Sequence, residues 1–179
     1  MTNIRKLKYP IGRFRKKTDA TPEMVRDWVK EISTFPDKLI NEVIDLTEEQ
    51  LDARYRPEGW TIRQVIHHCA DSHMNSFIRL KLALTEDRPV VKPYYENLWA
   101  ELEDSTEMPI DSSLKILEGV HARWAKLLNN LTEAQLSKVF IHPEHGTCIT
   151  IKHDLVTYAW HGNHHLAHIK EGKKRNNWL

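Results

Sequence analysis

Four long stretches of the chain alternate apolar and polar residues with the 3.6-residue period of an α-helix. Two of them open with a clear start signal: Thr21 precedes Pro22, and Thr61 is followed three residues later by Gln64. Pro36 lies inside the first stretch and predicts a kink or break there. The four expected helices cover residues 21 to about 45, 61 to about 85, about 112 to 129, and 150 or 151 to about 172.

The segments between these helices carry turn and loop signals. Residues 1–20 look irregular, and residues 87–111 hold three prolines, which predicts a long connection with one helical turn near residues 95–102. Thr47 and Gln50 form a capping-box pattern, which predicts a short helix after the first long one. The only hint of a β-strand is a short extended piece at about residues 139–142.

The sequence around this short helix is repeated in the second half of the chain. Residues 46–51 read Leu-Thr-Glu-Glu-Gln-Leu, and residues 131–136 read Leu-Thr-Glu-Ala-Gln-Leu. Each copy follows a long helix and leads into a helix that carries histidines. Two such halves predict an all-α fold, a four-helix bundle with pseudo-two-fold symmetry and a long crossover between its second and third helices. At 179 residues, the chain is expected to form a single domain over residues 1–179.

The composition is that of an ordinary globular protein and argues against several functions. A net charge of +1 gives no basis for nucleic-acid binding, and no window is apolar enough to span a membrane. The N-terminus lacks the apolar stretch of a signal peptide, so a reducing cytoplasm is the expected location. The two cysteines do not make a disulfide framework, and Cys69 falls on an apolar helix face, which favours a core residue.

The candidate chemistry of the chain lies in its histidines, which gather in two of the expected helices. In the second helix, His73 falls within the apolar stripe, whereas His68 lies on the polar flank of that stripe. The other residues of this flank are Ser72, Asn75 and Arg79. Such a flank is either exposed to solvent or the wall of a pocket inside the bundle. His67 points away from the core and is interpreted as a surface residue or as a support for a ligand.

The last helix carries four histidines within eight positions. His161 and His165 lie one turn apart on one face, at the border of the apolar stripe, and two neutral imidazoles at this spacing can bind one divalent metal. If the borders of the two helices face each other, His68 joins this pair in a site with open positions for water or substrate. His168 stays on the same face as a candidate fourth ligand, general base or supporting residue, whereas His164 lies off it.

Other catalytic motifs are absent from the sequence. There is no His-Glu-x-x-His pair, no glycine-rich phosphate loop and no Gly-x-Ser-x-Gly turn. His145 and Cys148 share one loop, but their proximity is weak evidence for a Cys–His nucleophile. A histidine-rich stretch can also be plain solvated surface, and the second cluster on another helix is what favours a metal site.

A specific spacing links the two clusters to a known family. Trp60 stands eight residues before His68, and the paired histidines follow in the last helix. With residues 59–75 and 158–169, and shorter matches at residues 9–12 and 92–94, the chain resembles the DinB-like superfamily and, within it, the YfiT branch of metal-dependent hydrolases. The resemblance implies a four-helix bundle, often a homodimer. It also implies one divalent metal per subunit, held by His68, His161 and His165 and completed by waters.

The resemblance leaves the reaction open between three classes. Three neutral histidines leave a metal its full double charge, which lowers the pKa of a bound water toward about 7. A hydrolase acting on a small-molecule substrate is therefore expected, with zinc as the metal and nickel as the alternative. Because the superfamily includes bacillithiol-dependent S-transferases, the second class is a transferase that uses a low-molecular-weight thiol. The third class is a non-catalytic metal-binding stress protein.

Two further expectations concern substrate and assembly. Ser72, Asn75 and Arg79 are candidates for holding an anionic or polar substrate, with plain surface residues as the alternative. Tyr9, Ile11 and Phe14 stand in an irregular segment with no obvious core of its own to join. They add to the expectation of a homodimer.

Overall fold

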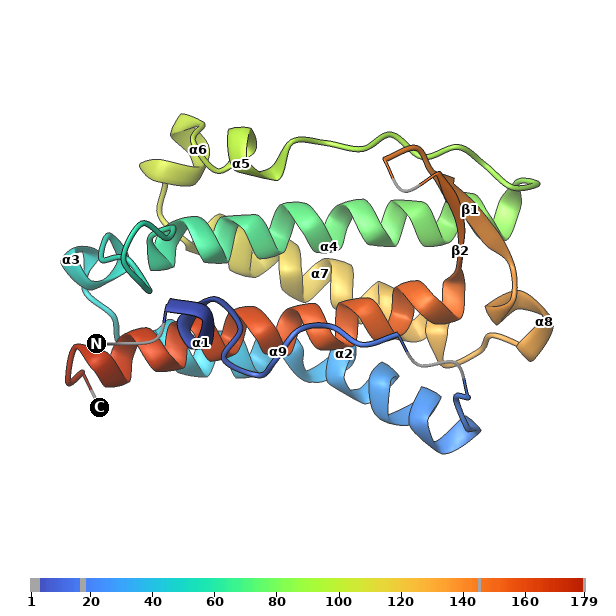
Figure 1. Cartoon of the computed structure of the whole chain (residues 1–179), viewed down its shortest axis with the longest axis horizontal. Coiled ribbons are helices and arrows are strands. Elements are labelled where there is room, and N and C mark those ends of the chain that lie inside the picture. The colour runs from blue at the N-terminus through green and yellow to red at the C-terminus, as the bar shows by residue number, and fades with distance from the viewer. Residues whose placement is uncertain (1–3, 17–18, 145, 179) are drawn as a thin grey trace.

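Four long helices form the body of the protein. The computed structural model describes residues 4–16, 19–144 and 146–178. The long helices are α2 (Pro22–Val43), α4 (Ile62–Thr85), α7 (Asp111–Leu128) and α9 (Ile151–Arg175). Figure 1 shows that α2 and α9 run in one direction, and α4 and α7 in the other. The predicted four-helix bundle is confirmed, and its long crossover makes the consecutive helices α4 and α7 parallel.

The helix starts follow the predicted local chemistry. The Thr21 side chain accepts a hydrogen bond from the backbone N–H of Met24, and Thr61 forms a full capping box with Gln64. Helix α2 continues through Pro36, so the predicted break is absent. Because proline has no N–H, the carbonyl of Ile32 loses its helical donor, and the Nδ1 atom of His121 lies 2.6 Å from that oxygen. The side chain of a neighbouring helix thus replaces the missing hydrogen bond.

The predicted internal repeat is present as two matched short helices. Helix α3 (Glu48–Leu51) and helix α8 (Glu133–Leu136) each begin with a complete capping box, made by Thr47 with Gln50 and by Thr132 with Gln135. Helix α3 lies between α2 and α4, and helix α8 lies between α7 and the hairpin that leads into α9 (Figure 1). The two halves therefore share local structure as well as sequence.

The connections hold more regular structure than predicted. Helix α1 (Ile4–Lys8) lies in the segment expected to be irregular, and the crossover contains α5 (Glu96–Trp99) and α6 (Glu103–Thr106) instead of one turn. Strands β1 (Val139–His142) and β2 (Thr147–Thr150) form an antiparallel hairpin, of which only β1 was predicted. The backbone of Ile141 also pairs with residues 89 and 91 of the crossover. This sheet is a small addition to an otherwise helical fold in the described part of the chain.

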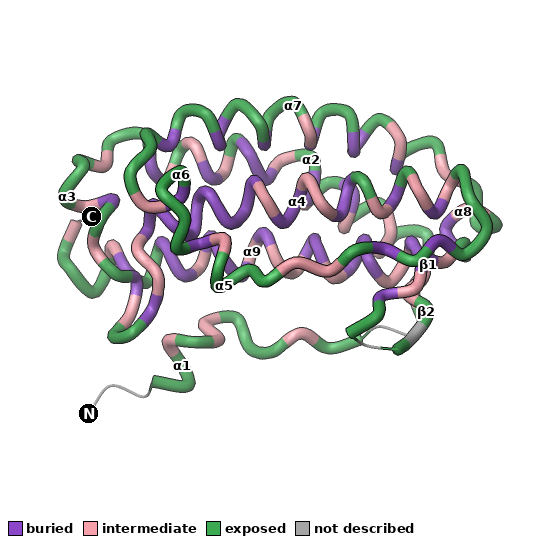
Figure 2. Tube along the Cα trace, turned by 90° about the horizontal axis from the view of Figure 1, so that it is seen from above, coloured by how far each residue is buried: buried purple, intermediate pink, exposed green. Residues whose placement is uncertain are grey.

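The core consists of the inward faces of the long helices. Figure 2 shows buried residues where the helices face one another and exposed residues on the outer side of α7. The sequence pattern predicts an apolar stripe on α4, and six of its residues are buried: Ile62, Val65, Ile66, Cys69, Phe77 and Leu80. Leu84, at the end of the stripe, is only partly buried. None of the helices that the structure describes combines the length and apolarity that crossing a bilayer requires.

The N-terminal segment packs along α9. The ring of Phe14 lies 5.8 Å from that of Trp160, and the ring of Tyr9 stacks on His164 at 6.0 Å. Ile11 remains 46% exposed. The expectation that this segment has no core of its own to join is therefore wrong for Tyr9 and Phe14, because aromatic side chains on the outer face of α9 receive them.

Candidate metal centre

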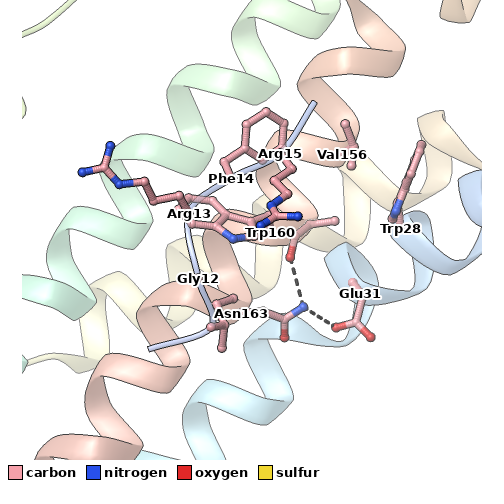
Figure 3. A pocket seen from close by; sticks show the side chains of 11 residues that line it. Gly12, Arg13, Phe14, Arg15, Trp28, Glu31, Val156, Trp160 and Asn163 are labelled. Carbon is pink, nitrogen blue, oxygen red and sulfur yellow. Dashed lines mark hydrogen bonds between the residues drawn. The ribbon is translucent and has the colours of Figure 1, made fainter. Parts of the chain in front are cut away.

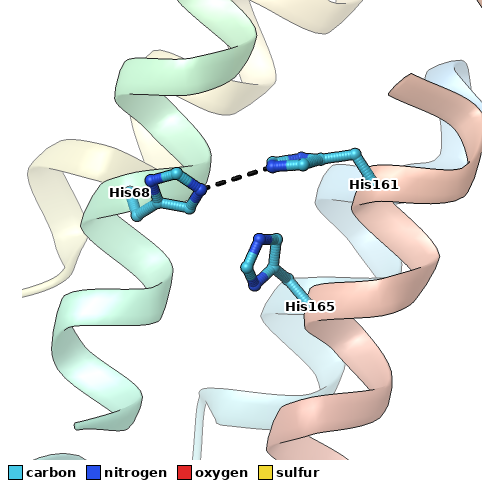
Figure 4. A group of neighbouring side chains, drawn as sticks. All are labelled: His68, His161 and His165. Carbon is cyan, nitrogen blue, oxygen red and sulfur yellow. Dashed lines mark hydrogen bonds between the residues drawn. The ribbon is translucent and has the colours of Figure 1, made fainter. Parts of the chain in front are cut away.

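Three histidines from two helices point toward one another (Figure 4). His68 comes from α4, and His161 and His165 come from successive turns of α9. One ring nitrogen from each lies within 4.8 Å of the others. The structure therefore brings together the three histidines that the sequence placed on the border faces of these helices.

The donor set and its spacing fit a divalent metal. Two nitrogens bound to zinc at about 2.1 Å in tetrahedral geometry stand about 3.4 Å apart. The Nε2 atoms of His68 and His161 are 3.3 Å apart. The widest separation in the set, 4.8 Å, would need a small side-chain rotation to close. Imidazole nitrogens suit zinc and nickel, and three of them leave positions for water or substrate.

Burial keeps these three rings neutral. It lowers the pKa of His68 to about 4, and it lowers the pKa values of His161 and His165 well below their ordinary range. Mutual repulsion among the neighbouring histidines lowers the latter two further. Neutral imidazole is the form that binds a metal, so no ring has to lose a positive charge first at neutral pH.

A second group of histidines continues from His161 into the core. The Nδ1 atom of His161 lies 3.0 Å from Nε2 of His73, and Nδ1 of His73 lies 2.7 Å from Nε2 of His121. His73 and His121 are each 1% exposed. The sequence analysis placed His73 in the apolar stripe without a role and missed His121. The available signal was the position of His121 on the apolar face of α7, between Leu117 and Trp124.

His67 is buried, which corrects its interpretation as a surface residue. Its Nδ1 lies 2.8 Å from the Ser113 hydroxyl, and its Nε2 lies 3.2 Å from the carbonyl oxygen of Met108. The end of the crossover and the start of α7 cover this face of α4. Helical geometry correctly turned His67 away from His68, but it could not show what would cover it.

His168 lies close to the three-histidine cluster without belonging to it. Its Nε2 lies 3.2 Å from the carbonyl oxygen of Lys8, and its ring stacks on Tyr55 at 4.1 Å. Burial lowers its pKa to about 3. His164, predicted to lie off the ligand face, stacks on Trp160 at 4.4 Å. The side chains of His164 and His168 therefore both pack against aromatic rings beside the candidate centre.

A cavity of about 560 Å³ reaches the cluster at His165. Its wall has basic side chains from Lys8 and Arg56 and acidic ones from Glu58 and Glu96. The remaining lining residues are Tyr9, Tyr55, Gly59, Trp60, Asn97, His164 and His168. The cavity therefore borders the candidate centre at His165, and His168 forms part of its wall.

The predicted substrate-binding residues lie elsewhere along α4. The hydroxyl of Ser72 is 3.2 Å from that of Tyr158, and Asn75 donates to the carbonyl of Asp71. Burial raises the pKa of Asp154 to about 6, and the hydrogen bond from Ser76 and the positive charge of Arg79 oppose this shift in part. None of Ser72, Asn75 and Arg79 lines the cavity at His165. Their contact with substrate stays a prediction.

Two other features carry no part of the centre. A cavity of about 480 Å³ lies between the N-terminal segment and helices α2 and α9. Figure 3 shows Asn163 at this cavity, donating to the carboxylate of Glu31. The cavity contains none of the three clustered histidines. Cys148 is exposed, with its Sγ 3.3 Å from a guanidinium nitrogen of Arg88, and its suggested partner His145 lies outside the described residues.

Comparison with known proteins identifies the family. The model of the DinB superfamily matches residues 17–169, and the chain belongs to this superfamily. A relative from Oceanobacillus iheyensis, named "Putative metal-dependent hydrolase OB0782", is 52% identical over 171 residues, which cover 96% of this chain and 98% of the relative. A "Putative metal-dependent hydrolase" of Bacillus cereus is 52% identical over 173 residues, with the same coverage of 96% and 98%.

A solved structure shares the whole architecture. YfiT from Bacillus subtilis superposes with a TM-score of 0.94 at 44% identity, and the match covers 97% of this chain and 99% of that one. That protein is described as "a probable metal-dependent hydrolase with an unusual four-helix bundle topology". The resemblance read from the sequence is confirmed for family and fold.

Proposed function

We propose that this protein is a metal-dependent hydrolase whose single divalent metal is held by His68, His161 and His165. The observation that carries the proposal is the convergence of three neutral imidazoles within 4.8 Å, beside a cavity that admits a small molecule. When bound, the metal would supply Lewis acidity that activates water near neutral pH. Zinc is the proposed metal and nickel the alternative, and the reducing cytoplasm is the proposed location.

The surrounding residues are proposed to bind and orient the substrate. On the cavity wall beside His165, Lys8 and Arg56 could pair with an anionic group of the substrate, and Glu58 and Glu96 could accept hydrogen bonds from it. The carbonyl of Lys8 can only accept a hydrogen bond, so Nε2 of His168 carries the proton and its buried Nδ1 keeps a free lone pair. We propose that His168 accepts a hydrogen bond from water or substrate through this lone pair, which requires its ring to turn toward the cavity because Nδ1 is buried in the present arrangement. With a pKa of about 3, it is too weak a base to store the proton.

One comparison separates hydrolysis from the second candidate, a thiol S-transferase. The basic side chains of Lys8 and Arg56 would suit an anionic thiol as well as an anionic ester. Metal-loaded, tag-free protein is given panels of esters and amides, and then small thiols with a chloro-aromatic compound or an epoxide. Turnover without thiol supports the hydrolase, and strict thiol dependence supports the transferase. Metal binding without either activity leaves the non-catalytic class.

Two variants test the details of this proposal. His168→Gln should lower kcat while metal content stays near one equivalent, and equal activity would remove His168 from the mechanism. Arg79→Ala tests the predicted contact on α4, because a raised KM for anionic substrates would extend the binding surface beyond the cavity. Light scattering at micromolar concentration tests the proposed homodimer, for which the crossover offers the exposed side chains of Val90, Tyr95, Leu98 and Leu102.

A further inference from the structure

An unbroken row of imidazoles connects the candidate centre to the backbone of α2. It runs from His161 on α9 to His73 on α4 and His121 on α7, with nitrogen–nitrogen distances of 3.0 and 2.7 Å. It ends where Nδ1 of His121 lies 2.6 Å from the carbonyl oxygen of Ile32. The proposed hydrolase chemistry uses only the first ring of this row.

The carbonyl end gives the row a direction. An oxygen of this kind accepts only, so the proton of neutral His121 must lie on Nδ1, and its Nε2 must accept. Pro36 strengthens this assignment, because the N–H that would otherwise occupy the Ile32 carbonyl does not exist. Each following nitrogen–nitrogen contact also needs one donor and one acceptor, so the protonated nitrogen of each further ring is fixed in turn. His73 donates from Nδ1 to His121 and accepts at Nε2, and His161 donates from Nδ1 to His73.

We propose that His121 and His73 are positioning residues that fix the tautomer of His161, so that its Nε2 lone pair faces His68 and His165. The proposal depends on the proposed metal centre only for its effect on metal affinity. A metal-binding histidine commonly donates its other N–H to a carboxylate or a carbonyl. Here the same task is carried through two further rings, on α4 and α7, to a carbonyl on a fourth helix, α2. Neither ring contacts the substrate cavity.

Packing holds the row in place. The ring of Phe35 lies 4.9 Å from that of His73 and 5.4 Å from that of His121. Trp124 lies against the other side, 5.5 Å from His121 and 6.1 Å from His73. With both rings buried among aromatic side chains, burial lowers the pKa of His121 to about 4 and that of His73 well below its ordinary range. The rings are therefore neutral, as the hydrogen-bond direction requires.

His68 provides an internal contrast. Its Nε2 faces the Nε2 lone pair of His161 at 3.3 Å, so in the metal-free protein His68 must carry its proton on Nε2. To bind a metal through Nε2, His68 has to release that proton or move it to Nδ1. His161 already presents a free lone pair. The proposal thus predicts that one ligand changes its tautomer on metal binding and the other does not.

Nitrogen-15 NMR of the imidazole rings tests the tautomers directly in the metal-free full-length protein. His121, His73 and His161 should each be protonated at Nδ1, and His68 at Nε2. Adding zinc should change the protonated nitrogen of His68 alone among the four. His161 protonated at Nε2 in the metal-free protein would overturn the proposal. This readout does not depend on zinc binding, so a wild-type protein that binds no zinc would refute the metal centre and leave the tautomer test intact.

Zinc affinity tests the consequence. His121→Phe and His73→Phe should each weaken zinc binding by about 10- to 100-fold, the usual loss when a partner of a metal ligand is removed. His153→Phe is the matched control, because it makes the same change on α9 next to Phe14, away from the row. Unchanged affinity in both folded variants would contradict the proposal. If a variant does not fold, the wild-type tautomers still decide.

Discussion

His121 on α7 donates to the carbonyl of Ile32 on α2 across 2.6 Å, and the two residues are 89 positions apart in the chain. The contact exists because Pro36 leaves that carbonyl without its own helical partner. Pro36 thereby frees the carbonyl oxygen at which the row of histidines behind the candidate centre ends.

Replacing Pro36 should move helix stability and metal affinity in opposite directions. Proline inside a helix costs about 3 kcal/mol, and Pro36→Ala restores the N–H that competes with His121 for the Ile32 carbonyl. The variant should unfold at a higher temperature and bind zinc more weakly. Thermal unfolding and competition with a chromogenic chelator measure the two effects. A gain in stability with unchanged zinc affinity would mean that the carbonyl accepts both donors at no cost to the row.

Removing one clustered histidine should abolish metal binding. His165→Ala leaves two imidazoles, and we expect it to lose most of the roughly one equivalent of metal found by elemental analysis of the tag-free protein. His153→Ala is the control, since His153 is on the same helix and outside the cluster. Equal metal content in the two variants would place the metal elsewhere.

The metal-free protein should lose stability as pH falls from about 6.5 to 4. A histidine with a depressed folded-state pKa contributes stability above its unfolded pKa, and this is lost as protons bind the unfolded chain preferentially. Eight buried histidines have pKa values lowered in this way: His67, His68, His73, His121, His161, His164, His165 and His168. Denaturant unfolding at several pH values measures how the free energy of unfolding changes with pH.

Two aspartates act in the opposite sense on this pH dependence. Burial raises the pKa values of Asp71 and Asp154 to about 6, so between pH 3.8 and 6 each favours folding as pH falls. Two aspartates cannot offset eight histidines, so the free energy of unfolding should rise with pH over this range. Zinc should move the loss to lower pH, because binding to the folded state opposes ligand protonation. A flat profile would mean that these histidines are solvated.

Gly162 lies between the proposed ligands His161 and His165 and should not tolerate a side chain. A Cβ atom there would stand 2.8 Å from Phe35, whose ring packs against His73 and His121. Gly162→Ala should therefore destabilise the fold by about 1–3 kcal/mol and weaken zinc binding. Gly119→Ala is the matched helical control, because its Cβ would meet nothing within 4 Å, and it should stabilise the fold by about 0.5–1 kcal/mol. Similar unfolding temperatures in both would show that Phe35 moves aside freely.

The parts of the fold that could be predicted from sequence are those with local causes. The starts of α2 and α4 follow from Thr21 and Thr61, whose caps involve residues three positions away. The faces of His68, His161 and His165 follow from helical rotation alone. Strand β2 depends on pairing with β1, and the contact of His121 with Ile32 joins distant helices. Local patterns could place His121 on an apolar face, but they could not show which distant groups β2 and His121 would contact.

The candidate centre also joins the two repeated halves of the chain. His68 belongs to the first half and His161 to the second, 93 positions later. An ion held by both would act on the unfolded chain as a cross-link does. In the chain-entropy treatment of disulfides, closing a loop of about 100 residues is worth roughly 4–5 kcal/mol. Cys69 and Cys148 are both free. Removing the ion with a chelator would then lower the free energy of unfolding, as reducing a disulfide does in a secreted protein.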